Sequence, residues 1–139
     1  MSVQKYPWII SVYKGENRIL IIPSIEHIGG YSVLSSWCIN IEKGDDCIKV
    51  GTGILDAMEY INNSPISSLT SKELDADVAW KRNSKYKSWI SFWNNNDNAK
   101  VIVYENGELD IYSTLRTEGR KGGYSGSIKK IVLPNADSP

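Results

Sequence analysis

Two pairs of β-rich runs, one near each end of the chain, constrain the fold more than any other feature. The first pair is WIISVY at 8–13 and RILII at 18–22, and the residues KGEN between them have the composition of a turn. The second pair is KVIVY at 100–104 and LDIY at 109–112, joined across Asn106 and Gly107. Asn-Gly between β-rich runs is the strongest short-range signal of a hairpin. We therefore predict an antiparallel hairpin at each end, and the unbroken apolar run at 18–22 predicts a strand covered on both faces.

A third β-rich stretch occupies residues 31–41. Within it Trp37, Ile39 and Ile41 alternate with Cys38 and Asn40, which is the two-residue period of a strand. The sequence CIKV at 47–50 follows the turn KGDD at 43–46 and predicts a returning strand. The glycines at 51 and 53 are expected to end that strand.

Three stretches in the middle of the chain have helical spacing. Apolar residues at 54, 55, 58 and 61 form one stripe of a short helix that ends before Pro65. Thr70 and Glu73 are spaced as a capping box, which predicts a second helix at 71–81. The segment 84–93 predicts a third helix, whose apolar stripe is Tyr86, Trp89, Ile90 and Trp93. We expect Trp89 and Trp93 to lie in the core.

The elements run from strands to helices and back to strands, ending with a predicted strand at 128–133. This order predicts an α+β fold, in which the N- and C-terminal hairpins build a mostly antiparallel sheet. Two to three helices from the middle of the chain are expected to pack on one side of it. The length of 139 residues fits a single domain covering 1–139, with 135–139 as a flexible tail.

Composition and the N-terminal segment predict a cytoplasmic location. Hydrophobic residues make up 41% of the chain, which is enough for one core, and 16 basic residues balance 16 acidic ones. No apolar run approaches the about 18 residues that a membrane-spanning helix needs, and the N-terminal segment lacks the pattern of a secretory signal. Without export, Cys38 and Cys47 are expected to be reduced thiols.

Residues that carry chemistry are sparse. His27 is the one histidine, and the two cysteines lack the spacing of a metal site. Phosphate-loop, dinucleotide-binding and nucleophile-elbow motifs are absent. His27, with Glu26 beside it, is a weak candidate for acid–base catalysis because no nucleophile stands at a recognisable spacing. We therefore expect a binding protein with no catalytic residues, no cofactor and no metal, and an enzyme that uses carboxylates or His27 ranks last.

Charged residues mark two candidate binding surfaces. The acidic turn EKGDD at 42–46 holds Glu42, Asp45 and Asp46. It lacks the spacing of an EF-hand, so it is either a solvated turn or a surface complementary to a basic partner. The segment 80–89 interleaves basic with aromatic residues, and the Gly-rich EGRKGGYSGS at 118–127 contains Arg120 and Lys121. These two segments support an alternative function, a small nucleic-acid-binding module, and the Gly-rich segment could bind an anion through its backbone amides.

Several structural motifs occur together over residues 31–127. VGTGILDA at 50–57 leads into a helix that ends in Asn63 and Ser64, an Ala-Trp pair at 79–80 precedes SWISF at 88–92, and a hairpin at 100–115 precedes Gly-Gly-Tyr at 122–124. In this combination the chain resembles the immunity proteins of bacterial contact-dependent growth inhibition systems.

The resemblance implies a function that needs neither catalysis nor a cofactor. An immunity protein of this kind stays in the cytosol and binds the toxic C-terminal domain of its cognate inhibition protein, often covering a nuclease active site. We therefore expect a one-to-one complex with such a domain, and neither a membrane nor direct nucleic-acid partner. If the toxin is a nuclease, its groove is basic, and carboxylates should face it. The candidate partner-binding residues are Glu42, Asp45 and Asp46, followed by Glu16 and Glu26.

Overall fold

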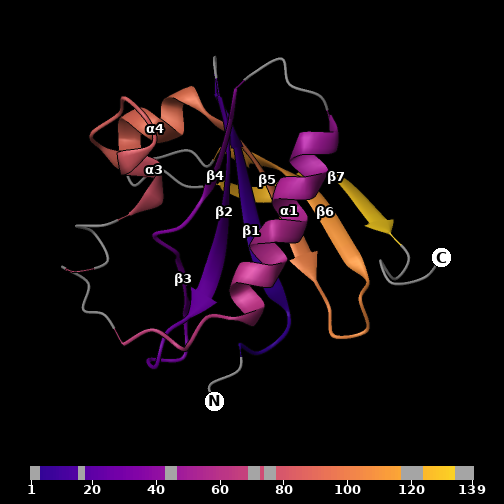
Figure 1. The fold of residues 1–139 in the computed structure, drawn as a ribbon. Helices are drawn as coiled ribbons and strands as arrows, with labels where there is room; N and C mark the ends of the chain where they lie inside the picture. The colour runs from indigo at the N-terminus through magenta and orange to yellow at the C-terminus, as the bar shows by residue number, and fades with distance from the viewer. Residues whose placement is uncertain are drawn as a thin grey trace.

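A computed structural model describes residues 4–15, 18–42, 47–68, 73, 78–116 and 124–133. The elements follow the expected α+β order (Figure 1). The strands are β1 (Trp8–Lys14), β2 (Arg18–Glu26), β3 (Ser32–Leu34), β4 (Ile39–Glu42), β5 (Asp97–Val103), β6 (Leu109–Arg116) and β7 (Tyr124–Leu133). The helices are α1 (Cys47–Asn62), α3 (Ala79–Arg82) and α4 (Trp89–Asn95).

All the strands pair antiparallel in one sheet, in the order β3-β2-β1-β5-β6-β7, and β4 also pairs with β2. The first predicted hairpin is confirmed, with a register that runs from Ile10 opposite Pro23 to Lys14 opposite Ile19. The four residues from Leu20 to Pro23 are buried in succession, so β2 is covered on both faces as its apolar run predicted.

The second hairpin is also confirmed, but its turn differs from the tightest Asn-Gly form. Gly107 has φ 86°, whereas no described non-glycine residue has a positive φ. Its amide donates to the carbonyl of Tyr104 over 2.9 Å, and the Tyr104 amide donates to the carbonyl of Glu108 over 2.9 Å. The turn is therefore a four-residue turn closed by a glycine in the left-handed region, and not a two-residue type I′ turn, in which Asn106 would also have a positive φ.

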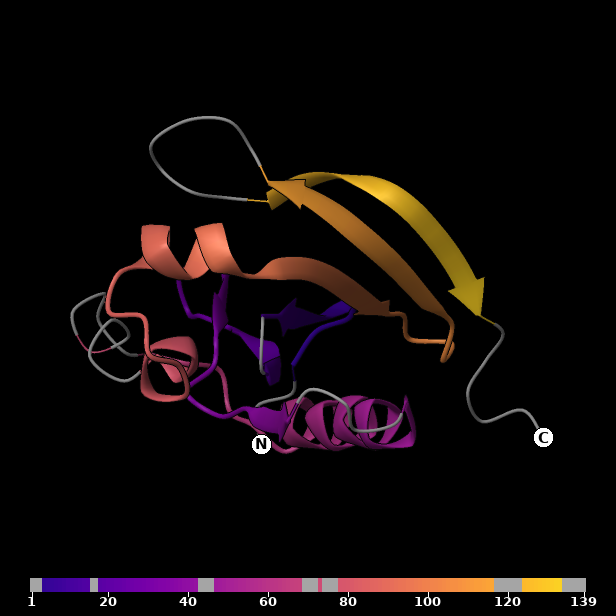
Figure 2. The same ribbon diagram turned by 90° about the horizontal axis from the view of Figure 1, so that it is seen from above.

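Helices cover both faces of the sheet, which corrects the expectation that they share one side (Figure 2). On one face α1 contributes Ala57 and Ile61 to a core that includes Ile21 of β2. On the other face α3 and α4 supply Ala79, Trp80 and Phe92 to a second core, with Leu20 and Ile22 of β2. Neighbouring residues of a strand point to opposite faces, so the continuous apolar run of β2 serves both cores.

The predicted strand at 47–50 is wrong, because Cys47–Asn62 forms the single helix α1. Gly51 and Gly53, expected to end a strand, lie inside this helix. Gly53 is buried, and a Cβ atom there would lie 2.7 Å from Ile21 Cδ1 and 3.3 Å from Ile39 Cγ2. The glycine therefore lets α1 approach the sheet closely, and packing outweighs its low helix propensity.

The aromatic helix begins later than the sequence predicts, and its buried side includes Phe92, which the predicted stripe omits. α4 begins at Trp89, after Ser88 caps it by accepting the Ser91 amide at Oγ over 3.2 Å. Phe92 is fully buried, whereas Ile90 is 38% exposed. Trp89 packs against the second core while half-buried, and Trp93 is also half-buried. Phe92 therefore belongs to the second core, Tyr86 and Trp89 of the predicted stripe pack against it, and Ile90 does not.

Several predictions fall outside the described residues. These are most of the helix predicted at 71–81, the Gly-rich stretch as far as residue 123, and the tail at 135–139. The predicted final strand is present and longer than expected, because β7 begins at Tyr124. Among the described helices, none has the length and apolar character needed to cross a membrane.

Candidate functional site

One end of the sheet carries two cavities that share Tyr6. The first has a volume of about 180 Å³, and Glu26 and Tyr31 are among the residues that line it. The second is an open hollow of about 550 Å³, lined by Glu105 and Glu108 of the β5–β6 turn together with Tyr6. The chain segment before β1, the turn after β2 and the β5–β6 turn all lie at this end of the sheet (Figure 1). We call Tyr6, Glu26, Tyr31, Glu105 and Glu108 the acidic–aromatic end.

The two tyrosines at this end are exposed yet held in place. Tyr6 is 40% exposed and stacks on Trp8, with ring centroids 4.3 Å apart and planes 14° apart. Tyr31 is 51% exposed and stacks on His27 at 4.6 Å and 13°. Each ring therefore presents an aromatic surface whose orientation is fixed before any partner binds.

The segment that carries Tyr6 is fastened by Gln4, which is 3% exposed. Gln4 Oε1 accepts the Glu26 amide over 2.6 Å, and its Nε2 donates to the Pro65 carbonyl over 2.9 Å. Trp8 Nε1 donates to the Gln4 carbonyl over 3.2 Å. These bonds tie the entry to β1 against the end of β2, so Tyr6 and Glu26 are brought to the same cavity.

The turn that carries Tyr31 is shaped by its two glycines. The His27 amide donates to the Tyr31 carbonyl over 2.8 Å, and Gly30, at φ 86°, donates to the His27 carbonyl over 2.9 Å. A Cβ at Gly29 would lie 2.6 Å from the Tyr31 ring. His27 Nδ1 accepts the Gly29 amide over 2.9 Å. His27 therefore stabilises the turn through this hydrogen bond and supports the Tyr31 ring by stacking. Ile28, next to it in the turn, is 69% exposed.

The carboxylates at this end occupy different environments. Glu26 Oε2 is buried and has no hydrogen-bond partner within the part of the chain that the structure describes. Asp110, which lines the larger hollow, is buried and accepts the Tyr104 and Tyr112 hydroxyls at Oδ2 over 2.7 and 3.2 Å. Glu105 and Glu108 are exposed. Glu105 and Glu108 therefore supply accessible negative charge, whereas Asp110 orients Tyr104 and Tyr112.

Of the predicted acidic residues, the structure describes Glu42 and Glu26, and these two lie far apart. Glu42 is exposed and stands opposite Arg18, where β2 begins, whereas Glu26 is the last residue of β2. With an advance of about 3.3 Å per residue, the two positions lie about 26 Å apart along the strand. Asp45, Asp46 and Glu16 lie outside the described residues. Sequence reasoning missed Glu105 and Glu108, whose only signal was their place beside the Asn-Gly turn.

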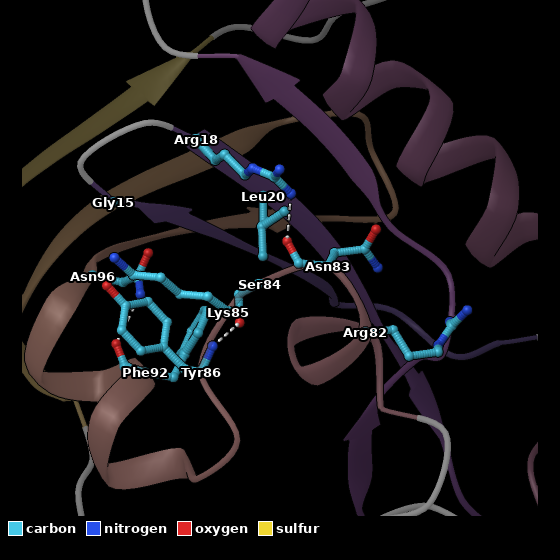
Figure 3. A pocket seen from close by; sticks show the side chains of 10 residues that line it. All are labelled: Gly15, Arg18, Leu20, Arg82, Asn83, Ser84, Lys85, Tyr86, Phe92 and Asn96. Atoms are coloured by element: carbon cyan, nitrogen blue, oxygen red, sulfur yellow. Dashed lines mark hydrogen bonds between the residues drawn. The ribbon is translucent and has the colours of Figure 1, made fainter.

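A third cavity, of about 460 Å³, lies between the start of β2 and the α3–α4 segment (Figure 3). Arg82, Lys85 and Tyr86 of the basic–aromatic segment line it, and Arg18 joins them from β2. We call this cavity the basic pocket. No local pattern indicated Arg18, because it is distant along the chain from residues 82–86. The predicted basic residues Arg120 and Lys121 lie outside the described residues.

The other predicted members of the basic–aromatic segment have structural places. Trp80 is buried and meets Trp89 edge-on at 5.5 Å, so both rings belong to the second core. Lys81 and Lys87 are exposed and do not line the basic pocket. The segment therefore divides into core aromatics and a smaller cationic group at the cavity.

Two further features of the described residues concern metal binding and cysteine reactivity. No group of three or more His, Cys, Asp or Glu side chains there is arranged to hold a metal ion. Cys38 is a free thiol. Burial raises the pKa of Cys38 above its ordinary value, and the nearby Arg82 guanidinium opposes this only in part. Its thiolate fraction at neutral pH is therefore reduced, which makes it a poor nucleophile.

Comparison with known proteins identifies the fold alone. No protein-family model matches the chain, and no curated protein matches it. A solved structure of a protein of unknown function from Neisseria meningitidis is similar, with a TM-score of 0.64 and 16% sequence identity. The match covers 97% of this chain and 88% of that chain. The sheet and its helices therefore form an architecture that another protein shares.

Proposed function

We propose that this chain is an immunity protein of a contact-dependent growth inhibition system. It binds the toxic C-terminal domain of its cognate inhibition protein one-to-one in the cytoplasm and blocks it. The observation that carries the proposal is the acidic–aromatic end, where exposed, pre-oriented tyrosines stand beside exposed carboxylates. The resemblance in the sequence motifs supports the same function.

The physical argument for a protein partner rests on the two tyrosines. Tyrosine is enriched at protein interfaces and among the residues that dominate binding energy. The stacking of Tyr6 on Trp8 and of Tyr31 on His27 reduces the side-chain entropy that binding would otherwise remove. Ile28 adds apolar surface beside them. This end therefore has the composition of an interface core.

The charges give the partner its chemical character. Glu105 and Glu108 place negative charge beside Tyr6, and Lys5 lines the smaller cavity. A nuclease domain presents a basic groove to its substrate, and complementary charge accelerates association with it. In this proposal the carboxylates stand in for the phosphates of the substrate and occlude the groove.

The first test is co-purification of the chain with the C-terminal domain encoded immediately upstream, followed by calorimetric titration. We expect a one-to-one complex that abolishes the toxicity of that domain. A folded, monodisperse chain that does not bind the domain would contradict the immunity function.

Matched variants then locate the interface. Tyr31→Ala should weaken the complex by about thirtyfold, the effect of removing one dominant interface residue. Glu105→Lys with Glu108→Lys should slow association by about tenfold at low salt. Glu42→Lys, at the far end of β2, should leave the affinity unchanged. If instead Glu42→Lys alone weakens the complex, the function stands but the interface is the acidic turn at 42–46.

The alternative, a small nucleic-acid-binding module, depends on the basic pocket. A polyanion retardation assay at moderate salt separates the two functions. Persistent, salt-sensitive retention of RNA together with failure to bind the toxin domain would favour the module.

A further inference from the structure

The basic pocket draws its charge from three separate parts of the chain. Arg18 begins β2, Arg82 ends α3, and Lys85 lies in the connection to α4. None of the described residues that line the pocket carries a carboxylate. The fold therefore concentrates positive charge at one hollow, although the whole sequence has a net charge of zero.

Arg18 is positioned at the edge of the pocket with most of its donors available. Its Nη1 donates to the Asn83 carbonyl over 3.0 Å, which holds the guanidinium across the entrance (Figure 3). A guanidinium has five N–H donors, and this is the one hydrogen bond that the described residues give it. The side chain is exposed. The protein therefore orients the Arg18 guanidinium and leaves it able to form a bidentate pair of hydrogen bonds with an anion.

Lys85 and Arg82 add charge from the helical side. Lys85 is exposed, and its Nζ lies 5.5 Å from the centroid of the Tyr86 ring. Arg82 lines the pocket, but its guanidinium turns away from Lys85 and Tyr86 and donates from Nη2 to the Ser36 carbonyl (Figure 3). Ser84 Oγ accepts the Tyr86 amide over 3.3 Å and keeps its own proton to donate. An anion in the pocket would therefore meet cationic and hydroxyl donors together.

The shape and walls of the pocket favour a small molecule. Its volume of about 460 Å³ lies within the roughly 300–1,000 Å³ that small-molecule sites occupy. Leu20, Tyr86 and Phe92 form the apolar and aromatic part of the lining. A strand of nucleic acid would instead need an extended track of charge, and neither Lys81 nor Lys87 continues the lining.

We propose that the basic pocket binds a nucleoside phosphate. Arg18 and Lys85 hold the phosphate, and the base lies against Tyr86. The site is on the α3–α4 side of the molecule, so the proposal does not depend on the immunity function. Variants in this pocket are expected to leave toxin binding unchanged.

The test is calorimetric titration of the full chain with ADP at low ionic strength, with adenosine and inorganic pyrophosphate as companions. We expect ADP to bind and pyrophosphate to compete with it, and adenosine alone to bind at least tenfold more weakly. No heat of binding with millimolar ADP, or equal binding of adenosine, would overturn the proposal.

Matched charge variants show whether the pocket is responsible. Arg18→Gln and Lys85→Gln should each weaken ADP binding about tenfold, the loss of one charge-assisted hydrogen bond. Lys81→Gln removes the same charge from α3 outside the pocket and should change the affinity less than twofold. Equal weakening in all three variants would overturn the proposal. Tighter binding of single-stranded oligouridylate than of ADP would also overturn it, in favour of an extended nucleic-acid surface.

Discussion

Gly51 and Gly53 lie on opposite sides of α1, and only at Gly51 should alanine stabilise the protein. Gly51 is exposed, and a Cβ there would meet no atom within 4 Å. Gly51→Ala therefore gains only the difference in helix propensity, about 1 kcal/mol. Gly53→Ala gains the same amount but places its Cβ 2.7 Å from Ile21 Cδ1, well inside the about 3.5–4.0 Å of a comfortable carbon contact.

The Ile21 side chain must shift to admit this Cβ, and its burial in the core between α1 and the sheet restricts that shift. Overpacking of a core typically costs about 1–3 kcal/mol. Gly53→Ala should therefore be neutral or destabilising by up to about 2 kcal/mol, and the two variants should differ by about 1–3 kcal/mol. Urea unfolding followed by circular dichroism measures this difference. Equal stabilisation by both alanines would refute the close approach of α1 to β2.

Two further predictions concern the second core. Phe92→Ala should lower the free energy of unfolding by about 3–5 kcal/mol, because Phe92 is fully buried, whereas Ile90→Ala on the same helix should cost under about 1.5 kcal/mol in urea unfolding. An equal loss of unfolding free energy in the two variants would contradict the burial of Phe92 in preference to Ile90. Burial raises the pKa of Tyr13 to about 12, despite a hydrogen bond with Ser11 that lowers it. Its contribution to stability is complete below pH 10 and is lost as the pH rises towards 12, by up to about 3 kcal/mol. Tyr13→Phe should remove this part of the loss between pH 10 and 12, and an unchanged pH profile in the variant would contradict the buried, neutral phenol.

Local sequence patterns could predict single residues of the candidate sites but not which residues lie together. Glu26 was identified as a candidate, but its cavity depends on Gln4, which joins the entry to β1 with residues near 64 through hydrogen bonds across the fold. Glu105 and Glu108 became part of the same surface only because Trp8 pairs opposite Val103, which brings the β5–β6 turn beside Tyr6. The basic pocket likewise needs Arg18 next to Asn83. No local spacing contains such long-range neighbours.

The sequence by itself determined the two hairpins, the doubly covered β2 and the α+β order, because turn residues and side-chain periodicity act over a few residues. Tertiary structure decided what competing local signals left open. Residues 47–50 have strand composition but extend α1, since the buried side of that helix packs against β2. Packing of α4 on the second face buries Phe92 and leaves Ile90 exposed. The distribution of helices over both faces, and the separation of an acidic–aromatic end from a basic pocket, follow from how the strands pair and which residues that pairing makes neighbours.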